Sequence, residues 1–489
     1  MGTRLRLSVQ DGMFLLAETQ ETPMHVGGLQ IFQVPPRAPA GFVATLFAKL
    51  RAFPVSVPPL NYRLTGGFAG KLLPSWEVSD DVEVDYHVRH CALPHPGGER
   101  ELGALVSRLH SNPMDLSRPL WEYHLIEGLA GRRFAVYTKL HHAMVDGAGG
   151  MRLMNLAPDR AHSCAPPFWA DPSRQSQEVP PHSNALLGWL PATVEDEVRS
   201  LPSLLRGLAT TAQAALGVAA EPDLASVTEA PRTMLNVRVG ARRRVATCAI
   251  DLARVKAIGR AAGGTINDVV LAACSGALRR YLAERDALPE HTLIAAVPMA
   301  LHHQEGTAAG NAVTCLIARL GTDVDDVRQR FESICRSSAA GKAQLKGMTQ
   351  TAALHFVAVL SLPVLLQTLV PGVETLIGPQ SNLIISNIAG PPERLYFHGA
   401  EMVAHYPVSQ VGHGMALNIT VLSYAGGLYF GFVACADSVP SVQRLAIHMD
   451  AAVDELEATF LAGLRRRADG KSAGARRRSP GRRTKAGRR

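Results

Sequence analysis

The chain contains two long stretches in which strand-like and helix-like segments alternate, and a proline-rich interval separates them. Such alternation is typical of α/β domains, in which helices cover the faces of a sheet. The interval covers residues 155–230 and combines one or two helical segments with a run of prolines, namely Pro166, Pro167, Pro172, Pro180 and Pro181. A chain of 489 residues is also longer than one hydrophobic core usually organises. We therefore expect an α/β protein with two domains and a crossover linker.

The last 25 residues differ in composition from the rest of the chain. Residues 465–489 hold 12 Lys and Arg and one Asp, a charge of +11, whereas the whole chain has a formal net charge of +8. The remainder therefore carries −3, and we expect no nucleic-acid-binding face on it. The low-complexity tail is predicted to be disordered. The expected organisation is a first domain over 1–155, a linker over 156–230, a second domain over 231–464 and the basic tail.

Two hairpins and two consecutive helices are the clearest local predictions. The hairpins pair residues 121–127 with 134–142 and residues 416–423 with 428–435, each across a turn that contains glycine. The helices are expected over 252–262 and 265–284. Asn267 could cap the second helix or face a channel, and the neighbouring Asp268 favours the cap.

The cysteines and the N-terminus point to a reducing compartment. The seven cysteines are an odd number and include no CxxC pair, so we expect reduced thiols in a cytoplasmic protein. Residues 1–12 lack the apolar segment of a secretory signal.

A neutral, apolar region lies between Lys346 and Glu374, where no residue carries a formal charge. A spanning helix needs about 20 apolar residues in a row, and Pro363 and several polar residues interrupt this one. We expect a helix pair that is buried or lies on an interface. This region and the basic tail are the candidates for peripheral contact with a membrane or lipid droplet.

The string from Lys139 to Gly147 contains the candidate catalytic residues: it reads KLHHAMVDG and lies at the end of a predicted strand. Strand alternation turns His141 and His142 to opposite faces, so one ring can enter a cavity while the other is structural. A neutral imidazole is suited to take a proton from a hydroxyl that attacks a thioester. Asp146 would fix the loop geometry, and Gly147 permits backbone angles or a close approach that a Cβ would block. No third metal ligand sits at a suitable spacing, so no metal is expected.

The HHxxxDG pattern of this string resembles the hallmark of the bacterial wax ester synthase/diacylglycerol acyltransferase family. Further strings resemble other family motifs in the family's order, from about residue 7 to 440. They are Leu7-Ser8 with Asp11, Thr22-Pro23-Met24-His25-Val26-Gly27-Gly28, Pro119-Leu120-Trp121-Glu122, Pro231-Arg232-Thr233, Asn267-Asp268-Val269-Val270, Gly310-Asn311 and Ser386-Asn387-Ile388-Ala389-Gly390-Pro391.

The resemblance implies two domains like chloramphenicol acetyltransferase, with a substrate channel between them. It also implies acyl-CoA as donor and diacylglycerol or a long-chain alcohol as acceptor, with no further cofactor. His142 would be the general base and His141 its structural neighbour. The other channel candidates are Asn267, Asp268, Met24, His25, Ser386 and Asn387, and for His25 a structural role is equally expected.

One departure from the family pattern concerns the acceptor. Where the family usually has a stretch that ends in Arg, this chain reads PMALHH over residues 298–303. Two other functions remain open at this point. One is a condensation-type enzyme that uses carrier-bound thioesters, and the other is an inactive lipid-binding protein. The oxyanion stabiliser is equally open, with Asn267 or a backbone N–H beside Gly147 as candidates.

Overall fold

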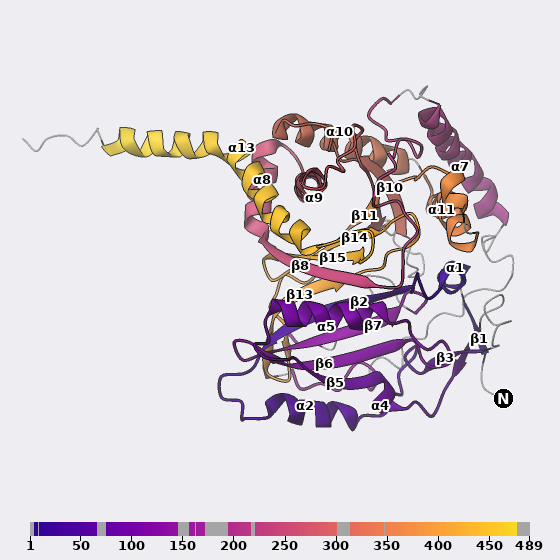
Figure 1. The fold of residues 1–489 in the computed structure, drawn as a ribbon, viewed down its shortest axis with the longest axis vertical. Coiled ribbons are helices and arrows are strands. Elements are labelled where there is room, and N and C mark those ends of the chain that lie inside the picture. The colour runs from indigo at the N-terminus through magenta and orange to yellow at the C-terminus, as the bar shows by residue number, and fades with distance from the viewer. Residues whose placement is uncertain are drawn as a thin grey trace, which may run out of the picture.

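Two six-stranded sheets form the body of the protein (Figure 1). The computed structural model describes residues 4–7, 9–65, 75–144, 156–161, 163–171, 194–216, 221–300, 313–346, 348–370 and 372–476. The mixed α/β architecture of the sequence prediction is confirmed, and the two sheets lie one above the other with helices on their outer faces.

The first sheet holds the HHxxxDG strand at its centre. Its order is β12 (Tyr396–Phe397), β13 (Ala400–Val408), β2 (His25–Gln33), β7 (Arg133–His141), β6 (Trp121–Leu129) and β5 (Val88–Ala92). All neighbours are antiparallel except β5 and β6. The β6–β7 hairpin is the first one expected from sequence. Its turn contains Gly128, Gly131 and Arg132 at positive φ, the region that favours glycine.

Strands β12 and β13 come from the segment expected to form the second domain, yet they complete the first sheet. The expected boundary at residue 231 therefore does not separate the two sheets, because the chain returns to the first sheet at residue 396. Strand β13 also crosses close to β15 (Gly427–Cys435): a Cβ on Gly431 would lie 1.7 Å from the Pro407 carbonyl oxygen. Glycine at this position permits the crossing.

The second sheet has the order β10 (Val313–Arg319), β9 (Ile294–Ala300), β11 (Leu383–Ile388), β14 (Leu417–Tyr424), β15 and β8 (Arg243–Asp251). The β14–β15 pair is the second expected hairpin. The hydrophobic core of the second sheet also contains residues of four helices, α8 (Leu252–Ala262), α9 (Ile266–Ala283), α10 (Val327–Lys346) and α13 (Gln443–Arg476). Helix α13 continues to Arg476, into the segment expected to be disordered. Residues 477–489 of the basic tail lie outside the described residues.

Helix α5 (Glu99–Ser111) joins the two sheets. Its Leu102, Leu105 and Val106 share a buried cluster with residues of the first sheet and with Val245 and Val433 of the second. Strand β8 is an edge strand, and α5 covers that edge. The Ser107 hydroxyl accepts the Val245 N–H at 2.9 Å, and the Ser111 hydroxyl accepts the Arg243 N–H at 2.8 Å. Two serines four residues apart thus accept hydrogen bonds from two backbone N–H groups of β8 that have no partner strand on this edge of the sheet.

The outer face of the first sheet is covered by α2 (Phe42–Arg51) and α4 (Val84–His87). A small sheet of β1 (Arg4–Arg6), β4 (Ser75–Val78) and β3 (Tyr62–Thr65) lies beside it, close to α1 (Val9–Ala17). Helix α1 contacts α11 (Gln350–Leu369), which packs against α7 (Val194–Ala215), and the short α12 (Val373–Leu376) follows.

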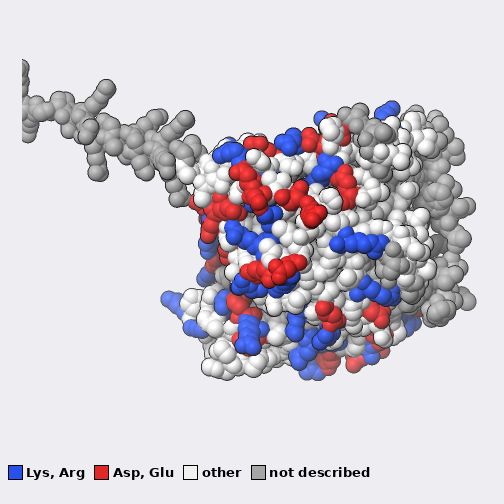
Figure 2. Space-filling model, turned by 45° about the horizontal axis from the view of Figure 1, so that its top comes forward, with Lys and Arg blue, Asp and Glu red and all other residues white. Residues whose placement is uncertain are grey.

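Acidic and basic side chains are interspersed on the described part of the face drawn in Figure 2, without a continuous field of one sign. Within the described ranges, no single helix has the length and apolar character to cross a membrane. Helices α8 and α9 reach that length and composition only together, with a bend of 100° between them.

Candidate active site

The motif histidines lie where β7 ends, and backbone hydrogen bonds hold them from both sides. His141 is the last residue of β7 and stands opposite His25 of β2. Its N–H donates to the Leu120 carbonyl at 2.9 Å, and the His142 N–H donates to the Met24 carbonyl at 2.8 Å. In the turn that follows, the Met144 N–H donates to the His141 carbonyl. The position of His142 is therefore set by two neighbouring strands.

The two rings have different surroundings, as the strand alternation predicts. His141 has no exposed surface, and its Nδ1 accepts the Ala143 N–H at 3.1 Å. Its Nε2 lies 3.5 Å from Oε2 of Glu18, an ion-pair distance longer than an ordinary hydrogen bond. His141 is thus enclosed by protein and unable to meet a substrate.

His142 is partly exposed as a residue, although its ring Nδ1 is buried, and one face of the ring is covered by Phe14 of α1. The ring centroids are 4.0 Å apart and the planes differ by 18°. Burial, together with the nearby His141, lowers the pKa of His142 to about 4. His142 is therefore neutral at pH 7, the form in which an imidazole can accept a proton.

An apolar cluster packs against the residues around His142. Leu15 of α1 packs with Tyr62, Trp76, Leu120 and Ala143, and Phe14 and Met144 lie at its margin. Helix α1 and the small sheet are thus anchored on the residue that follows His142.

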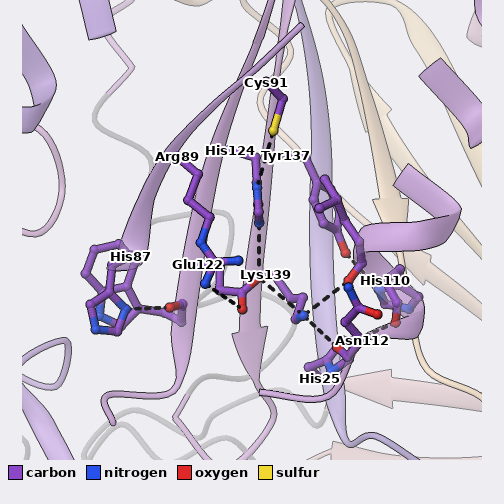
Figure 3. A network of polar contacts seen from close by, with 12 residues as sticks. His25, His87, Arg89, Cys91, His110, Asn112, Glu122, His124, Tyr137 and Lys139 are labelled. Carbon is purple, nitrogen blue, oxygen red and sulfur yellow. Dashed lines mark hydrogen bonds and ion pairs between the residues drawn. The ribbon is translucent and has the colours of Figure 1, made fainter. Parts of the chain in front are cut away.

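A buried polar network lies on the same sheet as the motif (Figure 3). The Lys139 ammonium is fully buried, lies 3.3 Å from a Glu122 carboxylate oxygen, and donates to the Leu109 and Asn112 carbonyls at the end of α5. Glu122 also accepts from His124 at 3.0 Å and lies 3.6 Å from Arg89. Burial raises the pKa of Glu122, but these three partners outweigh burial and lower it to about 2. The network ties the end of α5 to the strand that carries the histidines.

Met24 and His25, both predicted channel candidates, are buried next to the motif. Met24 contributes its backbone, which accepts from His142. The His25 ring directs Nε2 to the His110 carbonyl at 2.9 Å, and burial lowers its pKa well below the ordinary value. Its surroundings match the structural alternative for His25 rather than a channel mouth.

The predicted residues of the second half lie at element ends. Thr265, and not Asn267, is the N-cap of α9, because its hydroxyl accepts the Asp268 N–H while the Asp268 carboxylate accepts the Thr265 N–H. Asp268 is buried in this capping box, and Asn267 is partly exposed. Ser386 and Asn387 lie near the end of β11, with Asn387 exposed. Asp146, Gly147, Gly310, Asn311 and residues 301–303 lie outside the described residues.

Two residues at the site were missed from sequence, Phe14 and Glu18. Phe14 lies in α1, and no local sequence pattern pairs it with His142. Glu18 resembles any other charged residue near a helix end. Trp121 of the Pro119-Leu120-Trp121-Glu122 motif is a packing residue: it is fully buried, donates to the Leu60 carbonyl and stacks on His87 and Trp169.

Comparisons with known proteins agree with the motifs. Residues 7–270 match the wax ester synthase/diacylglycerol acyltransferase catalytic domain, and residues 309–457 match the C-terminal domain of the same proteins. The chain belongs to the wax ester synthase/diacylglycerol acyltransferase family. Among relatives in this family, a probable diacylglycerol O-acyltransferase of Mycobacterium tuberculosis is 41% identical over 452 residues, which cover 91% of this chain and 97% of that protein. An O-acyltransferase of Acinetobacter baylyi is 38% identical, with 91% and 96% covered.

Solved structures place the fold in the same family. The wax ester synthase/diacylglycerol acyltransferase from Marinobacter aquaeolei is 34% identical, with a TM-score of 0.73 over 93% of this chain and 99% of that one. A condensation domain of the calcium-dependent antibiotic synthetase has a TM-score of 0.54 at 18% identity, a likeness of fold alone. The chain is therefore an acyltransferase with the two-part fold that condensation domains share.

Among the described residues, no group of three or more His, Cys, Asp or Glu side chains is arranged to hold a metal ion.

Proposed function

We propose that the protein transfers a long-chain acyl group from acyl-CoA to the hydroxyl of diacylglycerol or of a long-chain alcohol, with His142 as general base. The observation that carries this proposal is the neutral imidazole of His142, a partly exposed residue directly after β7, in a chain of this family. The name of the Mycobacterium tuberculosis relative supports diacylglycerol as acceptor, and the name of the Marinobacter aquaeolei protein, a wax ester synthase/diacylglycerol acyltransferase, supports both acceptor types. No further cofactor takes part in the reaction.

The proposed transfer is direct. The neutral His142 takes the proton from the acceptor hydroxyl, and the oxygen attacks the thioester carbonyl carbon. The carbon–sulfur bond then breaks, and the imidazolium returns the proton to the departing thiolate of CoA. Hydroxyl and thioester become ester and thiol, and His142 is neutral again.

The remaining motif residues have supporting parts in this proposal. Asp146 and Gly147 hold the loop after His142, and the oxyanion is stabilised by Asn267 or by a backbone N–H beside Gly147. Asn267, Ser386 and Asn387 are the channel-lining candidates because their side chains retain exposed surface. Asp268, Met24 and His25 are buried and act as supports.

The test uses purified protein with labelled palmitoyl-CoA, a palmitoylated carrier protein, and diacylglycerol or hexadecanol as acceptor. The proposal expects ester formation from palmitoyl-CoA and a loss of about 100-fold or more in His142→Ala. His291→Ala, which alters an exposed histidine, is the control. Near-normal transfer by a folded His142→Ala protein refutes the base, transfer only from the carrier protein favours the condensation-type alternative, and no transfer from either donor favours a lipid-binding protein.

We also propose that α11 docks the enzyme on a lipid surface. Val359, Leu362, Leu366 and Leu369 follow helical spacing, and each is more than a third exposed. Val370 and Leu376 extend this apolar face beyond the helix end, and Leu376 is 84% exposed. An apolar face of this kind on a neutral segment suits the acyl region of a bilayer or lipid droplet better than an ionic partner.

The neighbouring elements connect this apolar face to the proposed base. Helix α11 contacts α1, and α1 carries Phe14, which lies on His142. An apolar substrate that leaves a lipid surface at α11 would therefore arrive close to the base.

Vesicle flotation separates this face from the basic tail. The tail needs anionic lipid and loses binding as salt screens it, whereas an apolar face binds neutral phosphatidylcholine vesicles at high salt. A variant with Leu362→Gln, Leu366→Gln and Leu369→Gln should lower that binding by about tenfold or more. The control Ile447→Gln alters an exposed residue of α13. Equal binding of both variants to neutral vesicles would refute the docking face.

A further inference from the structure

A buried carboxylate follows directly after α1 and lies 3.5 Å from the ring of the motif histidine His141. Glu18 is 6% exposed, although its sequence position, one residue beyond a helix end, is one where charged side chains usually reach water. Burying a carboxylate costs free energy unless hydrogen bonds and charges compensate it. The contacts of Glu18 therefore show which groups compensate the burial of its carboxylate.

The first contact fixes the backbone of His142. Oε2 of Glu18 accepts the N–H of Met24 in a short hydrogen bond. The carbonyl of the same Met24 residue accepts the N–H of His142 at 2.8 Å. One residue thus links the carboxylate to the base, and a shift of Met24 would move His142.

The second contact concerns the ring of His141. Because Nδ1 of His141 accepts the Ala143 N–H, the proton of the neutral ring is on Nε2. That Nε2 is buried without an ordinary hydrogen bond, and Oε2 of Glu18 lies 3.5 Å from it. The carboxylate therefore favours the tautomer in which Nδ1 is free to hold the turn after His142.

The charge of Glu18 has a compensating partner in the buried network. Lys139 lies on the same face of β7 as His141, two residues earlier, and its ammonium interacts electrostatically with both Glu122 and Glu18. Burial lowers the pKa of Lys139, and the two carboxylates oppose that effect. Lys139 thus provides a compensating charge for the buried Glu18 carboxylate.

We propose that Glu18 is a positioning residue for acyl transfer: its carboxylate orients His141 and, through the Met24 peptide, holds His142 where it meets the acceptor hydroxyl. This inference rests on the proposed role of His142. Glu18 itself touches neither substrate. Its removal should act on the rate of the chemical step, because the base would lose its geometry, while the binding of the acyl donor should change little.

The experiment compares Glu18→Ala and Glu18→Gln with the unaltered enzyme in kcat and in KM for the acyl donor. Glu18→Ala removes both contacts, and kcat should fall by about 100-fold with KM changed by no more than about threefold. Glu18→Gln keeps an amide oxygen that can accept the Met24 N–H but loses the charge beside the His141 ring, so its kcat should fall by a smaller factor, about three- to tenfold. Glu21→Gln is the matched control, since Glu21 lies in the same loop, is exposed, and its carboxylate accepts a hydrogen bond from the Thr19 hydroxyl.

The outcomes distinguish this inference from the general-base proposal. If His142→Ala is inactive while both Glu18 variants keep the unaltered kcat, the positioning role is refuted and the base stands. If His142→Ala retains activity, the base itself is refuted. Circular dichroism and thermal unfolding monitor the fold, and if Glu18→Ala does not fold, the kcat of Glu18→Gln decides. A full kcat for a folded Glu18→Gln would then overturn the proposal.

Discussion

The ring of Phe14 covers one face of the His142 imidazole, with 4.0 Å between ring centroids. This contact links helix α1 to the proposed base and limits the ring orientations of His142. Phe14→Ala should therefore lower kcat by about tenfold, because the imidazole gains orientations from which it cannot take the proton. Steady-state kinetics with palmitoyl-CoA and diacylglycerol measure the effect. Leu16→Ala, an exposed residue of the same helix, is the control, and an equal loss in both variants would contradict the prediction.

The pH dependence of activity should reflect the lowered pKa of His142. A general base works in its neutral form, so activity is complete above the pKa and falls as the pH drops through it. Since burial lowers this pKa to about 4, kcat/KM should be level between about pH 6 and 8 and decline only below about pH 5. Initial rates in overlapping buffers give the profile, and preincubation at low pH followed by assay at pH 7 controls for inactivation. A decline centred near pH 6.5 would contradict burial as the dominant influence.

Lys139 should be essential for stability rather than for proton transfer. Lys139→Met keeps the length of the side chain but leaves the buried Glu122 carboxylate with less compensation, and two carbonyls at the end of α5 lose their donor. The free energy of unfolding should fall by about 3–5 kcal/mol. Urea denaturation followed by circular dichroism measures it.

Two further variants test the cause of that loss. Adding Glu122→Gln to Lys139→Met should restore part of the stability, because the buried Glu122 charge that Lys139 compensates would also be removed. Lys256→Met, at an exposed position, should have little effect. A double variant less stable than Lys139→Met alone would show that the carboxylate is not the source of the loss.

Ser107 should contribute to the connection between the sheets. Ser107→Ala leaves the buried N–H of Val245 without an acceptor at the edge of β8, at a cost of about 1–3 kcal/mol. Hydrogen exchange should also become faster at Val245 than at residues in the centre of the second sheet. Arg108→Ala, an exposed neighbour on α5, provides the control. Unchanged exchange at Val245 in Ser107→Ala would mean that another group satisfies this N–H.

The parts of the fold that sequence patterns predict are those governed by local signals. The two hairpins carry glycine turns between strands of matched length, and α8 ends at Gly263, whose φ of 76° suits a helix end. Strand β13 carries no such signal: it contains Pro407 and His405, and its partner β2 lies more than 370 residues earlier. Its place in the first sheet depends on tertiary contacts that no local pattern encodes.

The same distinction applies to the site. Strand alternation predicts that His141 and His142 face different surroundings, and they do. The helix start near Asn267 was also recognised, although Thr265 provides the cap. The positions of Glu18 and Phe14 near the end of β7 were not predicted. They depend on the path of the chain between α1 and β2, which no local sequence pattern around these two residues indicates.

The return of β13 to the first sheet has a consequence for synthesis on the ribosome. Strand β2, whose preceding residue Met24 holds the base, keeps one edge unpaired until residue 408 of 489 has been translated. An unpaired edge invites association with other chains, and pairing across so long a sequence separation is slow. The nascent protein must therefore pass through a long interval in which its catalytic sheet is incomplete, so this enzyme should depend on chaperones during translation more than its stable folded form suggests.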